Sequence, residues 1–250
     1  MLLIKLGGSI ITNKDRPLSP RRRIMGKIAK ALKGLDEPMV LVHGGGSFGH
    51  YWSVIYDMHT RPEKYDLRGV AVVKNSMLEL NRIILDALLE NRLNPYSLSP
   101  THFMQGNKPV AARIREIAKI SKSGLIPVTF GDVLWYGQNK TYILSGDRIM
   151  THLSEILRPR LCMFALNEDG LYNNPDEKKL ITEFKNEQPS MSENKMDVTG
   201  GMTRKVSEAT AISNMGIRAF FVNGNKPERI VNAAKNIKFH GTLFRGRHNA

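Results

Sequence analysis

Short apolar runs rich in β-branched residues alternate with longer segments of helical period along this chain of 250 residues. Strand, helix and strand in repeated succession is the pattern of an α/β protein, and it limits the chain to folds with a mainly parallel sheet. The predicted strands cover 2–6, 39–43, 126–130, 161–166 and 219–223, and the predicted helices lie near 20–34, 67–92, 111–123, 147–157, 204–215 and 227–236.

Two segments depart from this alternation. In "VLWYGQNKTYILSGD" two β-rich runs flank "GQNK", which predicts a hairpin over about 133–144. The segment 173–197 is polar, contains proline and has few apolar residues. We expect it to be a flexible excursion, and long loops of this kind near a site often act as lids.

The cysteine content and the length of the apolar runs indicate in which cellular compartment the protein functions. Its single cysteine, Cys162, lies in the apolar run "LCMFAL", so it is expected to pack as a small hydrophobic residue, with no disulfide framework and no cysteine metal site. The first residues are too short an apolar stretch for a signal peptide, and there is no run of about 18 apolar residues for a membrane span. These features predict a cytoplasmic protein without membrane partners.

Basic residues outnumber acidic ones, 37 to 23, for a formal net charge of +14. Such a surface attracts anions, which include nucleic acids and phosphorylated small molecules. The basic residues are scattered, and the triple Arg21 to Arg23 is expected to be a solvated face near a helix start. Because aromatic residues do not interleave with them, a nucleic-acid-binding stripe is not favoured. A non-catalytic basic nucleotide- or nucleic-acid-binding module stays as an alternative.

Glycine is concentrated in three clusters, "KLGGS" at 5–9, "HGGGSFGH" at 43–50 and "TGGMTRK" at 199–205. Each stands just before a predicted helix, and backbone N–H groups at helix starts bind phosphate oxygens. In a parallel sheet the loops after the strands meet at one edge, where ligands bind. Three clusters of this kind indicate a site for a chain of phosphates.

Two known glycine motifs describe these clusters less well. Gly44, Gly46 and Gly49 satisfy the dinucleotide pattern G-x-G-x-x-G, which expects an acidic residue about 20 positions later at a strand end. Glu63 and Asp66 lie near that distance, but the sequence around them does not predict a strand. The phosphate-loop pattern G-x-x-x-x-G-K-[ST] does not occur.

Three lysines accompany the glycine clusters. Lys5 ends the first predicted strand, Lys14 closes the loop that follows, and Lys205 begins the helix after the third cluster. Their charges could neutralise the charge that moves in phosphoryl transfer, a reaction catalysed mainly by positioning and electrostatics. The pattern therefore predicts a phosphotransferase.

These motifs resemble those of the amino-acid kinase superfamily and, within it, of the archaeal-type isopentenyl phosphate kinases. The matching pieces are "KLGGSIITNK", "HGGGSFGH", "SGD" at 145–147 and "DVTGGMTRK" at 197–205, which together extend over nearly the whole chain. The histidine that ends the second cluster narrows the resemblance to these kinases and the fosfomycin kinases, whose acceptor is a phosphonate. A kinase of the UMP type is disfavoured by the same histidine.

The resemblance implies a three-layer αβα sandwich with a mainly parallel central sheet, formed by residues 1–250 as a single domain. Within it, about 1–160 would bind the acceptor and form the dimer, and about 161–250 would hold the nucleotide. It further implies ATP with Mg²⁺ as the donor, isopentenyl phosphate as the acceptor, isopentenyl diphosphate as the product, and a homodimer. Mg²⁺ would be carried by ATP, without dedicated protein ligands.

The resemblance also implies roles for individual residues. The catalytic set would be Lys5, Lys14, His50 and Asp147, with Asp147 orienting the lysines. ATP would be bound by Lys5, Gly7, Gly8, Ser9, Gly46, Asp169, Gly170, Gly201 and Lys205. The acceptor would be bound by Gly45, Gly46, His50, Gly131 and Val73.

The histidines and the acceptor's apolar tail lead to further expectations. A phosphate monoester has a second pKa of about 6 and is mostly a dianion at neutral pH, so no general base is needed and His50 is expected to donate a hydrogen bond. His43, at the end of an apolar strand, is expected to be a core residue, and the remaining histidines form no zinc-site spacing. Val70, Val73 and Met77 are candidates for contact with the isoprenoid tail, with a core or dimer role as the alternative.

Overall fold

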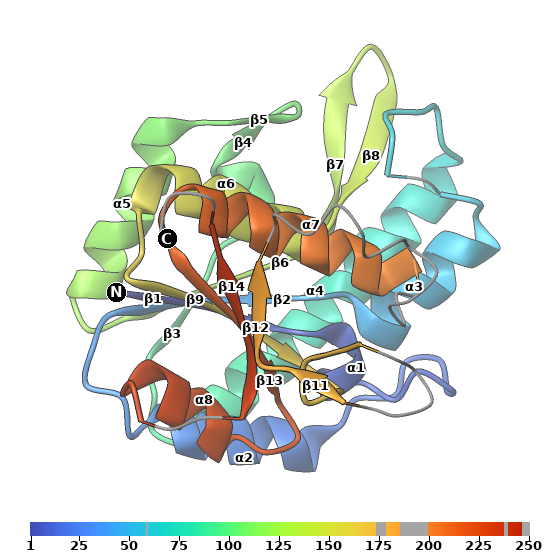
Figure 1. Cartoon of the computed structure of the whole chain (residues 1–250). Helices are drawn as coiled ribbons and strands as arrows, with labels where there is room; N and C mark the ends of the chain where they lie inside the picture. Colours follow the sequence, from blue (N-terminus) through green and yellow to red (C-terminus); the bar gives the residue numbers. More distant parts are fainter. Residues whose placement is uncertain (59, 174–178, 186–199, 238–239, 247–250) are drawn as a thin grey trace.

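A single eight-stranded sheet runs through the middle of the molecule (Figure 1). The computed structural model describes residues 1–250 except 59, 174–178, 186–199, 238–239 and 247–250. In sheet order the strands are β12 (Glu183–Lys185), β14 (Gly241–Arg245), β13 (Arg218–Asn223), β9 (Leu161–Leu166), β1 (Leu2–Leu6), β2 (Met39–His43), β6 (Ile126–Phe130) and β3 (Pro95–Ser97).

The sheet is mainly parallel, as the sequence predicts. Every strand pair in it is parallel except β13 with β14. The central strand β1 ends in register with both neighbours, since Leu6 pairs with His43 of β2 and with Ala165 of β9. The loops that follow these three strands therefore start at the same edge of the sheet.

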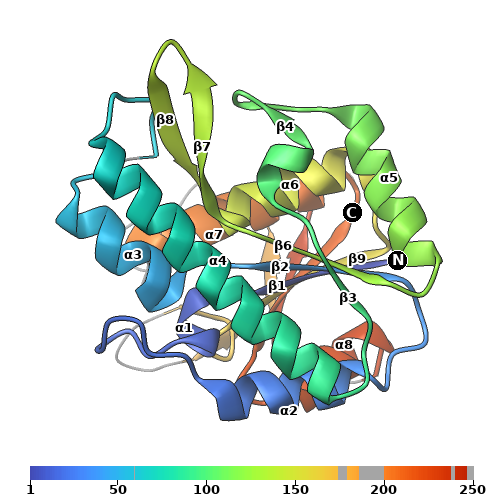
Figure 2. The same cartoon turned by 180° about the vertical axis from the view of Figure 1, so that it is seen from behind.

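Helices cover both faces of the sheet, which confirms the three-layer αβα sandwich (Figures 1 and 2). The helices α2 (Arg22–Leu32), α4 (Leu67–Glu90) and α8 (Glu228–Ala234) pack on one face, and α5 (Ala111–Lys122), α6 (Gly146–Leu157) and α7 (Gly200–Asn214) pack on the other. The alternation of side chains along β1 separates the two cores: Leu2 and Ile4 join the first, and Leu3 joins the second. Lys5 points to the same face as Leu3, toward α6.

Shorter elements complete the fold. They are the helices α1 (Gly8–Ile11) and α3 (Gly46–Ile55), the 3-10 turn η1 (Pro100–His102), and the strand pairs β4 (Met104–Gln105) with β5 (Lys108–Pro109), β7 (Asp132–Gly137) with β8 (Lys140–Leu144), and β10 (Leu171–Tyr172) with β11 (Leu180–Ile181). The pair β7 and β8 is the predicted hairpin. Its two turn residues, Gln138 and Asn139, both have positive φ, as the favoured two-residue hairpin turns require.

The sequence misses several elements. Both α1 and α3 begin inside glycine clusters, and glycine has a low helix propensity, so neither stands out as a helix. For the same reason α7 begins at Gly200, earlier than the predicted helix 204–215. Much of the predicted excursion 173–197 lies outside the described residues, but β11 and β12 form within the part that is described.

Several individual expectations are confirmed. Cys162 is buried with its Sγ 3.2 Å from Ser154 Oγ, and burial raises its pKa to about 12. His43 is buried on β2, its ring nitrogens 3.1 Å from Gly44 O and 3.3 Å from Asn81 Oδ1, and burial lowers its pKa to about 4. Of the expected solvated face, Arg22 and Arg23 are exposed on the first turn of α2. Arg21 departs from the expectation, because it is half-buried and its Nη1 donates to Ser9 O at 3.3 Å. Within the described ranges, none of the helices combines the length and apolar character that a membrane span needs.

Candidate active site

The first two glycine clusters are in direct backbone contact at the carboxyl ends of β1 and β2. A Cβ on Gly8 would lie 2.4 Å from the backbone N of Gly46, so glycine is required for this approach. Gly46 has a φ of +49°, a conformation that L side chains rarely adopt. Thr12 joins the two loops, because its Oγ1 donates to Gly8 O at 2.7 Å and accepts from Ser47 N at 2.9 Å.

A cleft of about 1110 Å³ opens where these loops meet. Residues from both of the first two clusters and from the start of α7 line it, so it brings the third cluster to the same place. The predicted site residues on its walls are Lys5, Gly8, Ser9, Lys14, Gly45, Gly46, His50, Val73, Gly131, Asp147, Gly201 and Lys205. Most of the residues that the sequence predicts for the site therefore line this cleft.

Asp147 lies between two of the predicted lysines. Its Oδ1 is 2.6 Å from Nζ of the buried Lys5, and its Oδ2 is 3.8 Å from Nζ of Lys205. The carboxylate is held in the first turn of α6, where Ser145 caps the helix by accepting a hydrogen bond from Arg148 N at 3.2 Å. The three charges form a cationic wall with one carboxylate between two ammonium groups.

The ammonium group of Lys205 has an unusual environment. Burial lowers its pKa to about 8, and the positive charges of Lys5, Lys14 and Arg204 act in the same direction against Asp147. Its Nζ donates to Gly201 O at 2.8 Å, which ties the side chain to the first turn of α7. An anion in the cleft would stabilise the charged form of Lys205, so this lysine is suited to bind a phosphate group.

His50 and apolar side chains also line the cleft. His50 is exposed on α3, whose N-cap residue is Gly45. In the first turn the N–H of Ser47 is donated to Thr12 Oγ1, and those of Phe48 and Gly49 are donated to Gly45 O. Val73 and Met77 of α4 are nearly buried but still line the cleft. Val70 is half-buried against the core and is not part of this wall.

Gly7, Asp169 and Gly170, predicted to bind ATP, do not line the cleft. Gly7 donates to Ala165 O at 2.9 Å, and a Cβ would lie 2.7 Å from that oxygen, so it allows β1 and β9 to approach. A Cβ on Gly170 would lie 2.4 Å from Thr242 Oγ1, so Gly170 fits closely against β14.

Asp169 belongs to a separate polar cluster after β9. Its Oδ1 is 2.6 Å from Nη1 of Arg229 and accepts from Nδ2 of Asn223 at 2.7 Å, while its Oδ2 is 3.1 Å from Nε2 of His240. Burial acts to raise the pKa of Asp169, but the hydrogen bonds from Asn223 and Arg229 keep it below its usual range. In this structure the carboxylate is engaged with protein partners.

Sequence reasoning misses two features of the cleft. Asp132 is buried and forms an ion pair with Lys74 of α4, and burial raises its pKa while Lys74 opposes the shift. Its position in "GDV" directly after β6 is a signal, but the partner on α4 cannot be found from the sequence. Arg204 also lines the cleft, and its place beside Lys205 in "TRK" could have indicated it.

The chain is similar to known proteins over nearly its whole length. The model of the amino acid kinase family matches residues 1–223. The isopentenyl phosphate kinase of Thermoplasma acidophilum is 31% identical, with 98% of this chain and all of the relative covered. That of Methanothermobacter thermautotrophicus is 30% identical, with 99% of this chain and all of the relative covered.

Solved structures show the same likeness. The crystal structure of a product complex of the Thermoplasma acidophilum isopentenyl phosphate kinase has a TM-score of 0.82 at 27% identity and covers 98% of this chain and all of the other. A substrate complex of an isopentenyl phosphate kinase matches with the same TM-score at 26% identity and the same coverage. The chain belongs to the amino acid kinase family.

Proposed function

We propose that this protein transfers the γ-phosphoryl group of ATP to isopentenyl phosphate, giving isopentenyl diphosphate and ADP. The observation that carries the proposal is the meeting of Lys5, Asp147 and Lys205 with the glycine clusters in one cleft. Cations and backbone N–H groups directed at one space are what the transfer of a phosphoryl group between two phosphorylated molecules requires. Its nearly full-length relatives named isopentenyl phosphate kinase support the choice of acceptor.

The reaction needs no general base. The acceptor's phosphate is mostly a dianion at neutral pH, so one of its oxygens attacks the γ-phosphorus directly while the bond to the β,γ-bridging oxygen breaks and ADP leaves. Lys5 and the N–H groups near Gly8 and Gly46 would stabilise the phosphoryl group in transit. Asp147 would hold Lys5 in place.

The two substrates enter from opposite ends of the cleft in this proposal. His50 would donate a hydrogen bond to the acceptor's phosphate, with Val73 and Met77 beside its tail. Lys205, with Gly201, would neutralise the phosphates of ATP, and Lys14 would neutralise phosphate charge during the transfer. Residues of about 1–160 would thus bind the acceptor and those of about 161–250 would hold the nucleotide, with Ser9, Gly45 and Gly131 along the path between them.

Mg²⁺ would enter as part of the substrate, bound to the phosphates of ATP, which are the hard oxygen ligands that it prefers. The carboxylate of Asp147 is already engaged by Lys5 and Lys205, so it is disposed to orient lysines. A homodimer and a cytoplasmic location stay predictions. Light scattering of the purified protein, with an expected mass twice that of the chain, tests the first of these.

A fosfomycin-type kinase is the nearest rival. Its acceptor carries a polar epoxide, whereas the acceptor end of this cleft presents Val73 and Met77. An apolar wall favours an acceptor with an apolar tail. Removing the apolar surface of the tail from water lowers the free energy in proportion to the area buried.

An acceptor panel tests the proposal directly. The purified protein is incubated with ATP and Mg²⁺ and with isopentenyl phosphate, fosfomycin, UMP or a carboxylate acceptor, and ADP release is followed. We expect turnover of isopentenyl phosphate well above the others. Turnover of UMP or fosfomycin with isopentenyl phosphate left untouched would show that the acceptor is wrong, and ADP release from none of them would reject the kinase assignment.

A further inference from the structure

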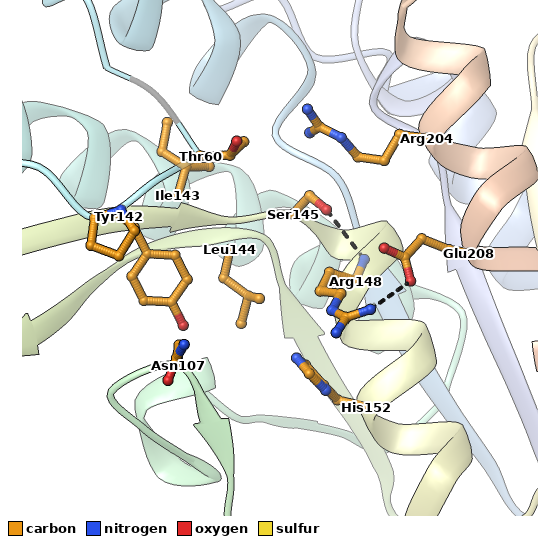
Figure 3. A pocket seen from close by; sticks show the side chains of 11 residues that line it. Thr60, Asn107, Tyr142, Ile143, Leu144, Ser145, Arg148, His152, Arg204 and Glu208 are labelled. Carbon is orange, nitrogen blue, oxygen red and sulfur yellow. Dashed lines mark hydrogen bonds and ion pairs between the residues drawn. The ribbon is translucent and has the colours of Figure 1, made fainter. Parts of the chain in front are cut away.

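A second cavity of about 320 Å³ lies beside the cleft, between the hairpin strand β8, the start of α6 and the first turns of α7 (Figure 3). Thr60, the segment 143–145 and Arg204 line both cavities. Arg148, His152 and Glu208 line the second cavity and not the cleft. Nothing in the proposed reaction uses these three side chains.

The charged groups around the second cavity favour an anion. Arg148 and Arg204 bring two guanidinium groups to its walls, and Glu208 is the one carboxylate among its described lining residues. Nη1 of Arg148 is 3.4 Å from Oε2 of Glu208, which also accepts a hydrogen bond from the hydroxyl of Thr151. The carboxylate therefore positions Arg148, and the surplus charge of the wall is positive. Guanidinium groups match phosphate oxygens in geometry as well as in charge.

His152 adds a neutral side chain to the cavity wall. Its side chain points from α6 toward the cavity (Figure 3), and the residue is only 6% exposed. Among the described residues its buried Nδ1 has no hydrogen-bond partner, since the nearest carboxylate oxygen, of Glu155, is 3.9 Å away. Burial lowers the pKa of His152 to about 4 and Arg148 adds to the effect, so the ring is neutral at pH 7.

We propose that this second cavity binds the phosphate or diphosphate group of a small phosphorylated molecule, between the guanidinium groups of Arg148 and Arg204 and within reach of His152. Two molecules could supply this diphosphate group: inorganic diphosphate, or an isoprenoid diphosphate formed as the product. Ile143 and Leu144 add an apolar wall that only the second source would use. The proposal that the cavity binds an anion does not depend on the proposed function. Only the identification of that anion with the isoprenoid product rests on it.

Arg204 couples the second cavity to the cleft. It lines both, and it directly precedes Lys205. An anion in each cavity would compete for this one guanidinium group and repel the other anion, so each ligand weakens the binding of the other. Because such coupling is reciprocal, the effect is measurable from either side.

Calorimetric titration without Mg²⁺ tests the site. Isopentenyl diphosphate and, separately, inorganic diphosphate are titrated into the full-length protein and into Arg148→Gln, Lys205→Met and Arg115→Gln. Arg115 is exposed on α5 and lines neither cavity, so its loss controls for net charge. We expect two sites in the unchanged protein and in Arg115→Gln. In Arg148→Gln the second-cavity site should weaken by about tenfold or more, as loss of a charged hydrogen bond predicts.

The outcomes separate the second cavity from the cleft. Lys205→Met should weaken binding in the cleft and leave binding in the second cavity unchanged. If Lys205→Met changes binding at neither site, the assignment of the cleft site fails, while the result for Arg148→Gln still stands. A single site in the unchanged protein, or two sites that Arg148→Gln leaves as they are, overturns the proposal. Tighter binding of isopentenyl diphosphate than of inorganic diphosphate at the second site identifies the isoprenoid source, and equal binding identifies the inorganic one. His152→Phe, which keeps both arginines, should also weaken this site and provides a second variant if Arg148→Gln does not fold.

Discussion

Oδ1 of Asp147, in the first turn of α6, lies 2.6 Å from Nζ of Lys5 at the end of β1, and both side chains are buried. A buried ammonium group needs a partner, because burial in a low dielectric penalises an isolated charge. The pair thus stabilises the fold at the same place where it prepares the cleft for phosphates. Its two roles can be separated experimentally.

Asp147→Asn should lower stability and activity together. It leaves Lys5 buried without a counterion, which typically costs about 3–5 kcal/mol in the free energy of unfolding. Loss of lysine orientation should lower kcat by about 10²- to 10³-fold, the range seen when an oriented electrostatic contact is removed. Urea unfolding and the ADP-release assay measure the two effects.

Adding Lys5→Met to Asp147→Asn distinguishes the roles. The double variant has no unpaired buried ammonium group at this position, so it should regain part of the lost stability while activity stays low. If the double variant regained neither stability nor activity, or regained both, the ion pair would not be what connects stability with activity.

His50→Ala should affect the acceptor selectively. Loss of a hydrogen bond to a charged phosphate typically costs about 1.5–3 kcal/mol, so KM for isopentenyl phosphate should rise by about 10- to 100-fold. KM for ATP should stay close to its original value. His102→Ala, at a histidine that lines neither cavity, is the control. A parallel rise in KM for ATP would place His50 at the nucleotide end.

The lowered pKa of Lys205 predicts a pH dependence of ATP binding. The free protein loses the charge on Lys205 as the pH rises through about 8, whereas ATP binds the charged form. Affinity for ATP should therefore fall above about pH 8, and binding there should be accompanied by proton uptake, which calorimetry in buffers of different ionisation enthalpy detects. Lys205→Arg stays charged, so its affinity should be flat over the same range. A flat profile in the unchanged protein contradicts the prediction.

The same shift has the opposite effect on stability. Since the pKa of Lys205 is about 8 when folded and higher in the unfolded chain, the unfolded state binds more protons between the two values. This lysine therefore makes the ligand-free protein more stable as the pH rises through that window. The unfolding free energy of Lys205→Met should lack this contribution, as urea titrations at several pH values can measure.

Five of the eight strands of the central sheet, and the two lysines of the cationic wall, were predictable from sequence for one reason, whereas Asp147 came only from the resemblance in motif. Buried parallel strands must be continuous apolar runs, so β1, β2, β6 and β9 stand out, and their order fixes which loops share an edge. Short edge strands such as β12, with the sequence "EFK", have no such signature because little of them is buried. Their formation depends on partners distant in sequence, here β14.

Side-chain pairs between different helices and strands could not be predicted either, because they too depend on partners that are distant in sequence. Lys74 and Asp132 are ordinary charges in the sequence, and only packing of α4 against β7 joins the partly exposed lysine to the buried carboxylate. A resemblance in motif also assigns Asp169 and Gly170 to ATP, and this assignment stays a prediction. The structure places the two residues in a polar cluster and a tight strand contact that do not line the cleft. Local sequence identifies residue types with suitable chemistry, and the tertiary fold decides which of them meet.

Gly8→Ala should damage the cleft through its backbone. The new methyl group would lie 2.4 Å from the backbone N and 2.5 Å from Cα of Gly46, so the two glycine loops must move apart. Forcing atoms into a close contact of this kind typically costs about 1–3 kcal/mol in stability. A displacement of about 1 Å at reacting groups can lower the rate by about 10²-fold. Gly8→Ala should thus lose far more activity than its modest fall in melting temperature would suggest.

Gly26→Ala is the matched control for this change. Gly26 lies within α2, and a Cβ there meets nothing within 4 Å. Replacing glycine by alanine in a helix stabilises it by about 0.5–1 kcal/mol, so the melting temperature should rise slightly while ADP release is unchanged. If Gly8→Ala kept full activity, the close approach of the first two glycine loops would not be needed for phosphoryl transfer, and the cleft would have to work with the loops further apart. If both variants lost activity alike, the loss would reflect a general response of the fold to added methyl groups, and the contact between Gly8 and Gly46 would have no special role.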